Sequence, residues 1–397
     1  MNTAEAEEMA GLCEALGLVA AQTWRDAEVV ILNSCSVRQI AEDKVYGWGK
    51  KWEKQGKRIF GSGNLPGGEA VQQDGLPLVI LTGCMVGSAR GKRKRINETE
   101  LARRANFVDY FVDQGSYGEQ LPTILMKEGM TSGVVGGERA GHGTPLRARR
   151  KEGSHAYIKI SEGCDNFCTY CVVPHARGEE RSKDRQMILD EVKALVGQGY
   201  EHITLLGQNV NSWGIASPEE KKAIRINSNQ PLPFASLLRE IHALEGLSKL
   251  SFVSSNPFDF TQDMIEVLKL PKIDRFLHMA VQSGSNAVLK RMNRRHTAEE
   301  FTDLASRIRQ TVPDIELGTD LIVGFCGETD EDFEATLALV RTVRFNVAYL
   351  AMYSPRPGTF AATHWVDDVP KIVKKQRYER LLTAVEAADP GRGKGNS

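Results

Sequence analysis

The feature that most constrains the fold is a regular alternation of short apolar segments and amphipathic segments between residues 157 and 353. The apolar segments resemble buried strands, and the amphipathic segments have helical periodicity. Six successive strand–helix units predict a partial parallel barrel, (βα)6, with functional loops after the carboxyl ends of the strands. The expected strands span 157–161, 202–206, 250–254, 276–282, 315–323 and 347–353, and the expected helices span 187–196, 234–244, 261–268, 287–292, 299–310 and 331–343.

A second α/β pattern precedes the barrel. Buried strands that alternate with helices predict a doubly wound parallel sheet for the N-terminal domain. The apolar runs lie at 29–34, 58–62, 78–82 and 107–113, and the clearest helical patterns at 3–16 and 37–55. We expect four segments, namely the N-terminal domain over 1–132, a glycine- and charge-rich linker over 133–155, the barrel over 156–388 with a last helix at 370–388, and a disordered tail over 389–397.

The composition excludes several classes of protein. Equal numbers of basic and acidic side chains, 51 of each, exclude a globally basic nucleic-acid-binding protein. There is no apolar run of about eighteen residues that would span a membrane. The first residues, MNTAEAEEMA, are acidic and helix-like, unlike a signal peptide. We therefore expect a cytoplasmic protein whose seven cysteines are reduced and available for metal binding or catalysis. We also expect a monomer.

Three cysteines lie within eight residues of the segment SEGCDNFCTYCVVPHARG, which spans residues 161–178. They are Cys164, Cys168 and Cys171, just past the first predicted barrel strand. A structural zinc site needs four ligands, and an electron-transfer iron–sulfur cubane takes four cysteines. Three ligands leave one iron open for a substrate, as in catalytic metal sites. The spacing favours such an open cluster, and it leaves zinc with a distant fourth ligand and incidental thiols as alternatives.

Two further cysteines have similar surroundings. Cys35 follows the apolar run VVILNS, and Cys84 follows LVILTG. In a doubly wound sheet the carboxyl ends of the strands form the ligand crevice, so equivalent placement on two strands favours a shared site. The alternative is two small buried side chains, because free cysteine is often part of a core.

The CxxxCxxC spacing, with Tyr170 before the third cysteine, resembles the radical S-adenosylmethionine (SAM) superfamily. The whole set of motifs resembles the methylthiotransferase family within it. The motifs are NSCSVRQIAEDKV, GCM, GCDNFCTYCVVPHARGEERS, LLGQNVNSWG, HMAVQSGSNAVLKRMNRRHT, TDLIVGFCGETDEDF and YSPRPGT. CSVR and LLGQNVNSWG resemble the subfamily that modifies N6-isopentenyladenosine beside the tRNA anticodon.

This resemblance implies the reaction and the cofactors. One SAM molecule would supply a methyl group and a second the 5′-deoxyadenosyl radical, while sulfur would come from an auxiliary [4Fe–4S] cluster and be added at C2 of the adenine. A donor such as flavodoxin or ferredoxin would supply electrons. The alternatives are the related subfamily that acts on N6-threonylcarbamoyladenosine, and a non-catalytic iron–sulfur protein that only binds or transfers electrons.

The resemblance also implies roles for residues. Cys164, Cys168 and Cys171 would hold the radical cluster, and Cys35 and Cys84 the auxiliary cluster. The expected cofactor pocket comprises Tyr170, Gly207, Gln208, Asn209, Gln282 and Ser283, although loop residues of these types also occur for backbone reasons alone. Arg177 and Arg181 are expected to contact RNA phosphates. The basic runs 91–95 and 147–151 would either track the RNA backbone or be solvated charge.

Three departures from the family pattern generate further expectations. Family members end with a small RNA-binding β-barrel module, TRAM, and carry a first auxiliary cysteine that would fall before Met1 here, so we expect a truncated chain whose auxiliary cluster is incomplete. Cys13 is not a substitute, because with Leu12 and Leu16 it forms the apolar face of a helix. Cys326 stands where the family has proline and is expected to be a buried thiol.

Overall fold

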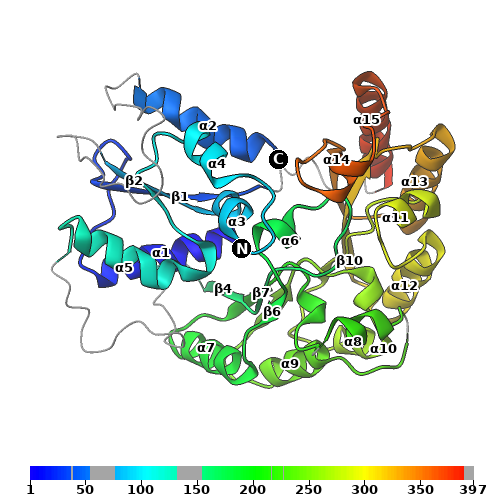
Figure 1. Ribbon diagram of the computed structural model, residues 1–397. Helices are drawn as coiled ribbons and strands as arrows, with labels where there is room; N and C mark the ends of the chain where they lie inside the picture. Colours follow the sequence, from blue (N-terminus) through cyan, green and yellow to red (C-terminus); the bar gives the residue numbers. More distant parts are fainter. Residues whose placement is uncertain (37–38, 54–76, 132–153, 216, 227, 389–397) are drawn as a thin grey trace. The chain divides into compact units, whose positions relative to one another are not determined.

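The computed structural model describes residues 1–36, 39–53, 77–131, 154–215, 217–226 and 228–388. The chain divides into two compact units, shown in Figure 1. The first comprises Met1–Glu152 together with Val172–Glu179, and the second comprises Gly153–Cys171 and Glu180–Ser397. The predicted barrel domain, 156–388, included residues 172–179, whose contacts place them in the first unit. Within the described residues, no helix is both long and apolar enough to cross a bilayer.

The first unit is built on a parallel sheet of three described strands in the order β1-β2-β3. Alternate residues of β2 point to opposite faces, and each face is covered by helices, as Figure 1 shows. Val79 and Leu81 pack with α2, α3 and α4, whereas Leu78 and Ile80 pack with α1 and α5. The elements are α1 (Asn2–Ala15), β1 (Val29–Ser34), α2 (Gln39–Glu53), β2 (Leu78–Gly83), α3 (Cys84–Arg90), α4 (Glu98–Arg104), β3 (Tyr110–Phe111), η1 (Gln114–Ser116), α5 (Tyr117–Lys127) and α6 (Val173–Ala176).

The second unit contains six parallel strands. Two three-stranded sheets, β4-β7-β8 and β9-β10-β11, are joined by isolated parallel bridges that pair Leu250 with Ile273 and Ser255 with Met279. The result is the predicted partial barrel. Its strands are β4 (His155–Lys159), β7 (His202–Leu206), β8 (Lys249–Phe252), β9 (Phe276–His278), β10 (Glu316–Val323) and β11 (Val347–Met352).

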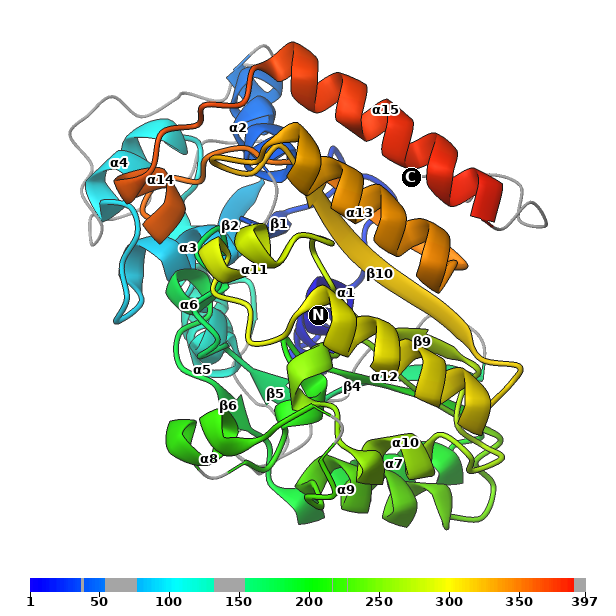
Figure 2. The ribbon, with the colours of Figure 1, turned by 90° about the vertical axis from the view of Figure 1, so that its right-hand side faces the viewer.

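Helices cover the outside of the strands, as Figure 2 shows. Their apolar faces and the strands form one continuous buried core in this unit. A two-stranded antiparallel hairpin, β5 (Ser161–Glu162) with β6 (Arg181–Ser182), follows β4. The helices are α7 (Arg185–Gly197), η2 (Val210–Ser212), α8 (Pro218–Ala223), α9 (Pro233–His242), η3 (Pro257–Asp259), α10 (Gln262–Val267), α11 (Asn286–Arg291), α12 (Ala298–Thr311), α13 (Asp330–Val343), α14 (Phe360–His364) and α15 (Lys371–Ala388).

Most predicted elements are confirmed to within two residues, and β1 and β7 have the predicted bounds. The strand predicted over 276–282 is regular only as far as His278. Beyond it, the Thr319 hydroxyl takes the place of backbone groups in the ladder: it donates to the Met279 carbonyl (2.8 Å) and accepts from the Val281 amide (3.1 Å). The predicted strand 107–113 is likewise reduced to Tyr110–Phe111.

Two strand ends differ from the prediction for conformational reasons. The strand predicted to end at Ser254 ends at Phe252, because Ser254 adopts a left-handed backbone with φ 70°. Ser161 was predicted to end the first barrel strand, but it pairs with Ser182 in the hairpin. The predicted strand 58–62, nearly all of the linker 133–155, the tail 389–397 and the basic run 147–151 lie outside the described residues.

Two stacked histidines mark the amino-terminal edge of the barrel. His155 and His202 are the first residues of paired strands, and their ring centroids lie 3.9 Å apart. Nε2 of His202 lies 2.8 Å from the Ser251 hydroxyl, which donates to Asp274 (2.7 Å). Burial lowers the pKa of His202 to about 4, and His155 and then Lys249 act in the same direction. Burial also lowers the pKa of His155.

These pKa values predict an acid-sensitive barrel. An unfolded histidine has a pKa of about 6.5, so on acidification the unfolded chain binds protons before folded His202 does, which destabilises the fold. Stability linked to His202 should be complete above pH 6.5 and should decrease as the pH falls toward about 4. Urea unfolding of His202→Gln should show a smaller loss between pH 7 and pH 5 than the parent, whereas a control variant at exposed His364 should match the parent. Equal losses in the parent and in His202→Gln would contradict this assignment.

Candidate functional site

The carboxyl ends of β1 and β2 bring two cysteines together. The register pairs Ser34 with Gly83, and Cys35 and Cys84 are the next residues. A hydrogen bond with the Cys35 thiol, and then burial, raise the pKa of Cys84, whereas the Arg177 guanidinium acts in the opposite direction. Two adjacent thiols shielded from water suit a metal or cluster, whose positive charge would allow them to ionise.

The turn between β2 and α3 depends on glycine at position 83. Gly83 has φ +90°, and a Cβ atom there would lie 2.4 Å from the Ser34 carbonyl oxygen. The Ser34 hydroxyl fastens the same turn, because it donates to the Thr82 carbonyl (2.6 Å) and accepts from the Met85 amide (3.2 Å). The chain can therefore turn directly from the strand into a helix that begins with Cys84.

Arg177 was predicted to contact RNA, but its guanidinium is buried within the first unit. It pairs with buried Glu5 through Nη1–Oε1 (2.6 Å) and Nη2–Oε2 (3.1 Å). The same carboxylate accepts from Gln114 (3.0 Å) and Asn33 (3.3 Å). A phosphate could reach Arg177 only by breaking this buried pair, so Arg177 is instead a cation beside the thiol of Cys84.

Cys13 lies away from the strand ends, as predicted. Helix α1 starts beside β1, where the Asn2 side-chain amide donates to the Ser34 carbonyl (3.2 Å). Cys13 is eleven residues further along the helix, roughly 16 Å at 1.5 Å per residue. It packs against the core that contains Leu12 and Leu16.

In the second unit, Cys164, Cys168 and Cys171 lie on the loop that follows the β5 strand. Bonds from the α11–α12 connection and from helix α14 fix the backbone of this loop. The Asn293 side-chain amide donates to the carbonyls of Asn166 (3.2 Å) and Phe167 (3.1 Å). Thr169 donates its amide to the Met292 carbonyl (3.2 Å) and accepts from the Ala361 amide (2.9 Å).

The three thiols share one electrostatic environment. Burial raises the pKa of Cys164, Lys221 lowers it, and the thiols of Cys168 and Cys171 raise it further. Nη1 of Arg294 lies 3.5 Å from Sγ of Cys168. Cys164 therefore senses the charge of the other two thiols.

The arrangement differs from a site for a single ion. Among the residues that the structure describes, no three His, Cys, Asp or Glu side chains are arranged to hold one metal ion. In a cubane cluster each thiolate binds a different iron, so the thiolates stand further apart than around one ion.

Unpartnered buried polar atoms gather at the carboxyl ends of β4, β7 and β8. Ser161 Oγ, Gln208 Oε1, Asn209 Oδ1 and Ser255 Oγ have no hydrogen-bond partner within the described part of the chain. A Cβ atom at Gly207 would lie 2.3 Å from Ser161 Oγ, so glycine keeps this rim open. Buried polar groups need partners, and a polar ligand at this rim would supply them.

The remaining predicted pocket residues behave differently from one another. Tyr170 is partly buried and meets the Phe325 ring edge-on, with ring centroids 6.3 Å apart. Gln282 is buried with a left-handed backbone, φ 74°. The Ser283 hydroxyl has protein partners: it lies 3.3 Å from the Thr336 hydroxyl and accepts from the Ser285 amide (3.2 Å). It braces α11 against α13. Arg181 is exposed on β6, and its predicted RNA contact stays a prediction.

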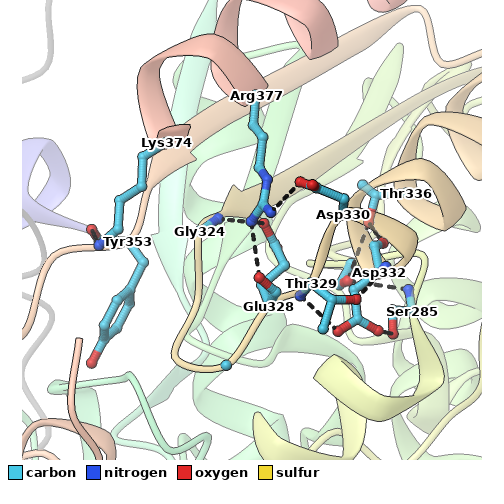
Figure 3. Close-up of polar contacts among 12 residues, drawn as sticks. Ser285, Gly324, Glu328, Thr329, Asp330, Asp332, Thr336, Tyr353, Lys374 and Arg377 are labelled. Carbon is cyan, nitrogen blue, oxygen red and sulfur yellow. Dashed lines mark hydrogen bonds and ion pairs between the residues drawn. The ribbon is translucent and has the colours of Figure 1, made fainter. Parts of the chain in front are cut away.

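The sequence analysis missed two groups of buried charges. Lys221 and Glu180 form an ion pair of 2.5 Å that influences Cys164. Figure 3 shows the second group, in which α15 anchors the β10–α13 loop. Arg377 binds Glu328 (2.8 Å) and Asp330 (2.7 Å), and Lys374 donates to the Tyr353 carbonyl (3.0 Å). The available signal was basic residues at helical spacing in KIVKKQRYERLL, which also fits a solvated helix.

Two family models match the chain. The radical SAM superfamily model covers residues 158–340, and the model of Uncharacterized protein family UPF0004 covers residues 1–109. A tRNA-2-methylthio-N(6)-dimethylallyladenosine synthase from Moorella thermoacetica is 39% identical over 387 residues, which cover 96% of this chain and 79% of that protein. A protein of the same name from Caldicellulosiruptor saccharolyticus is 36% identical and covers 97% and 76%.

The chain belongs to the radical SAM methylthiotransferase family. Membership confirms the predicted enzyme class, a tRNA methylthiotransferase, and the use of [4Fe–4S] clusters and SAM. Among solved structures, the radical SAM methyltransferase TsrM from Kitasatospora setae is similar, with a TM-score of 0.56 at 16% identity over 89% of this chain and 66% of that chain. That likeness shows the fold alone, and it agrees with the predicted α/β architecture.

For a methylthiotransferase with this geometry, Gly83 is a sensitive position. Gly83→Ala should destabilise the protein by more than the 1–3 kcal/mol or so of left-handed backbone strain, because the new methyl group meets the Ser34 carbonyl. It should also lower the iron content, because Cys84 follows directly. Gly17→Ala is the matched control: it has nearly the same φ, +89°, and nothing within 4 Å of the new atom. Equal unfolding midpoints and iron contents for the two variants would refute the steric account.

Proposed function

We propose that this protein adds a methylthio group to C2 of N6-isopentenyladenosine, also called N6-dimethylallyladenosine, next to the anticodon of tRNA. The observation that carries the proposal is the 39% identity to a synthase of that name over 96% of the chain. The three-thiol loop and the rim of unpartnered polar atoms supply the site that such chemistry needs.

Cys164, Cys168 and Cys171 would hold the radical [4Fe–4S] cluster and leave one iron open to SAM. When bound, the cluster and SAM supply the 5′-deoxyadenosyl radical that activates the substrate carbon. The chain's own contribution is placement. Asn293 and the backbone of Met292 and Ala361 hold the loop in position, and the burial of Cys164 limits access of water to its thiol.

The polar groups of SAM would bind at the rim formed by the carboxyl ends of β4, β7 and β8. Ser161, Gln208, Asn209 and Ser255 offer unpartnered oxygens there, and Gly207 provides the space. Asn209 is oriented for this role, because its amide nitrogen donates to buried Asp259 (2.8 Å) and leaves Oδ1 for a ligand.

Cys35 and Cys84 would hold the auxiliary cluster that provides sulfur. Arg177, paired with Glu5, contributes a positive charge that favours the thiolate form of Cys84. The distance along α1 argues against Cys13 as a further ligand. Predicted interactions with tRNA would include Arg181 and the exposed Lys92 and Lys94, whose phosphate contacts weaken with salt. We also propose a cytoplasmic monomer that is reduced by a flavodoxin or ferredoxin.

Nucleoside analysis tests the substrate. Mass spectrometry of tRNA from a deletion strain should show loss of 2-methylthio-N6-isopentenyladenosine and accumulation of N6-isopentenyladenosine, both reversed by the restored gene. Loss of the 2-methylthio-N6-threonylcarbamoyl nucleoside instead, with the isopentenyl product intact, would transfer the assignment to the related subfamily.

Separate variants test the two groups of cysteines. Cys168→Ala should abolish release of 5′-deoxyadenosine from SAM under reducing conditions, because the open cluster loses a ligand. Cys35→Ala with Cys84→Ala should retain that release and lose the methylthio product, together with the iron and sulfide of one cluster. If Cys168→Ala released 5′-deoxyadenosine at the parent rate, or if the double variant lost no iron, the corresponding ligand assignment would be wrong.

A further inference from the structure

Arg294 is a buried cation in the connection between α11 and α12. Its side chain makes three bonds: Nη1 donates to Cys168 Sγ (3.5 Å) and to Asn256 Oδ1 (3.0 Å), and Nη2 donates to the Ala280 carbonyl. The guanidinium also lies over the Phe258 ring, 4.8 Å from its centroid. The residue as a whole is 8% exposed.

The neighbouring Arg295 shows what a conventional buried arginine looks like here. It lies over the same ring, 4.3 Å from the centroid. Unlike Arg294, whose hydrogen bonds include no carboxylate, it pairs directly with one, since Nη2 lies 2.5 Å from Asp259 Oδ1. The other oxygen of that carboxylate accepts from Asn209 (2.8 Å). Two adjacent arginines therefore share an aromatic surface and differ in their partner.

A buried charge is costly unless an anion compensates it. Two of the bonds of Arg294 go to neutral amide and carbonyl oxygens, and the third goes to a sulfur. That sulfur balances the positive charge only as a thiolate, which is its form when it ligates iron. The position of Arg294 thus makes electrostatic sense when Cys168 is a cluster ligand.

We propose that Arg294 is a positioning residue that donates a hydrogen bond to the cluster-bound thiolate of Cys168 and makes the cluster easier to reduce. The inference rests on the proposed role of Cys168. Hydrogen bonds and positive charge at the sulfur ligands raise the reduction potential of iron–sulfur clusters, because the reduced form carries one more negative charge.

The surrounding sequence holds this bond in register. Residues 292–294 act on the cysteine loop in succession: the Met292 carbonyl accepts from Thr169, the Asn293 amide binds two loop carbonyls, and Arg294 reaches Cys168. Asn293 has a left-handed backbone, φ 58°, a conformation that asparagine tolerates. Residues 292 and 293 hold the cysteine loop, and residue 294 bears the guanidinium. Adjacent backbone therefore fixes the position of the guanidinium relative to the sulfur of Cys168.

The test is the midpoint potential of the radical cluster, measured without SAM in the full chain with reconstituted clusters. Arg294→Met should shift it to a more negative value, lowering the reduced-to-oxidised ratio at a fixed potential about tenfold, which for one electron is about 59 mV. Arg294→Lys keeps the charge without the planar fork and should shift it less. The control, Arg295→Met, removes the neighbouring charge over the same Phe258 ring, whose bonds go to Asp259 and the Lys221 carbonyl, and should leave the potential near that of the parent.

Each outcome decides the question. Parent potentials in both Arg294 variants, or an equal shift in Arg295→Met, would overturn the proposal. Normal potentials with weakened SAM binding would also overturn it, because Arg294 would then be a ligand for the SAM carboxylate. If Arg294→Met does not fold, the midpoint potentials of Arg294→Lys and Arg295→Lys are compared instead. The proposal then requires a shift in Arg294→Lys that is absent from Arg295→Lys. If the cluster signal persists in the Cys168→Ala variant, the assignment of Cys168 as a cluster ligand is itself wrong.

Discussion

The cysteine loop of the second unit has little regular structure, and its shape depends on hydrogen bonds that its backbone makes with distant segments. Cys164, Cys168 and Cys171 can act together only if the carbonyls between them are fixed. Asn293, in the α11–α12 connection, and Ala361, in helix α14, donate those bonds. The barrel thus brings these segments next to the cysteine loop, and the chemistry depends on the hydrogen bonds that hold the loop in place.

The two proposed cluster sites solve the same electrostatic problem in similar ways. Cys35 and Cys84 follow two parallel strands, whereas the other three cysteines follow β5 of the antiparallel hairpin. At both sites burial opposes ionisation of a thiol, and an arginine acts on a cysteine. Arg177 acts on Cys84 and Arg294 on Cys168. The arginines differ in one respect, because Arg177 is paired with Glu5 and Arg294 has no carboxylate among its bonds described above. The surroundings of Cys84 are therefore closer to electrical neutrality than those of Cys168.

The sequence was sufficient for those parts that depend on local patterns. Apolar strands followed directly by Cys35 and Cys84 predicted their neighbourhood, because parallel strands align their carboxyl ends. The partial barrel followed from the alternation of strands and helices. What could not be predicted depends on contacts between distant residues: Arg294 is 126 positions from Cys168, and Arg177 is 172 from Glu5. Neither pair leaves a local pattern. The same holds for Ser283, whose partner Thr336 lies 53 positions away.

The membership of residues Val172–Glu179 in the first unit has a consequence for how the protein can be divided. These residues follow the last cysteine of the loop, yet they supply Arg177 to Glu5 and the His175 ring to the Arg93 carbonyl (3.0 Å). Gly87 also packs so closely on Ala176 that a Cβ would lie 1.9 Å from its carbonyl oxygen. A fragment cut at the linker would leave Glu5 as a buried, uncompensated carboxylate. The two units are therefore not modules that recombination or cloning can exchange at the linker, because the first is completed by a piece of chain encoded inside the second.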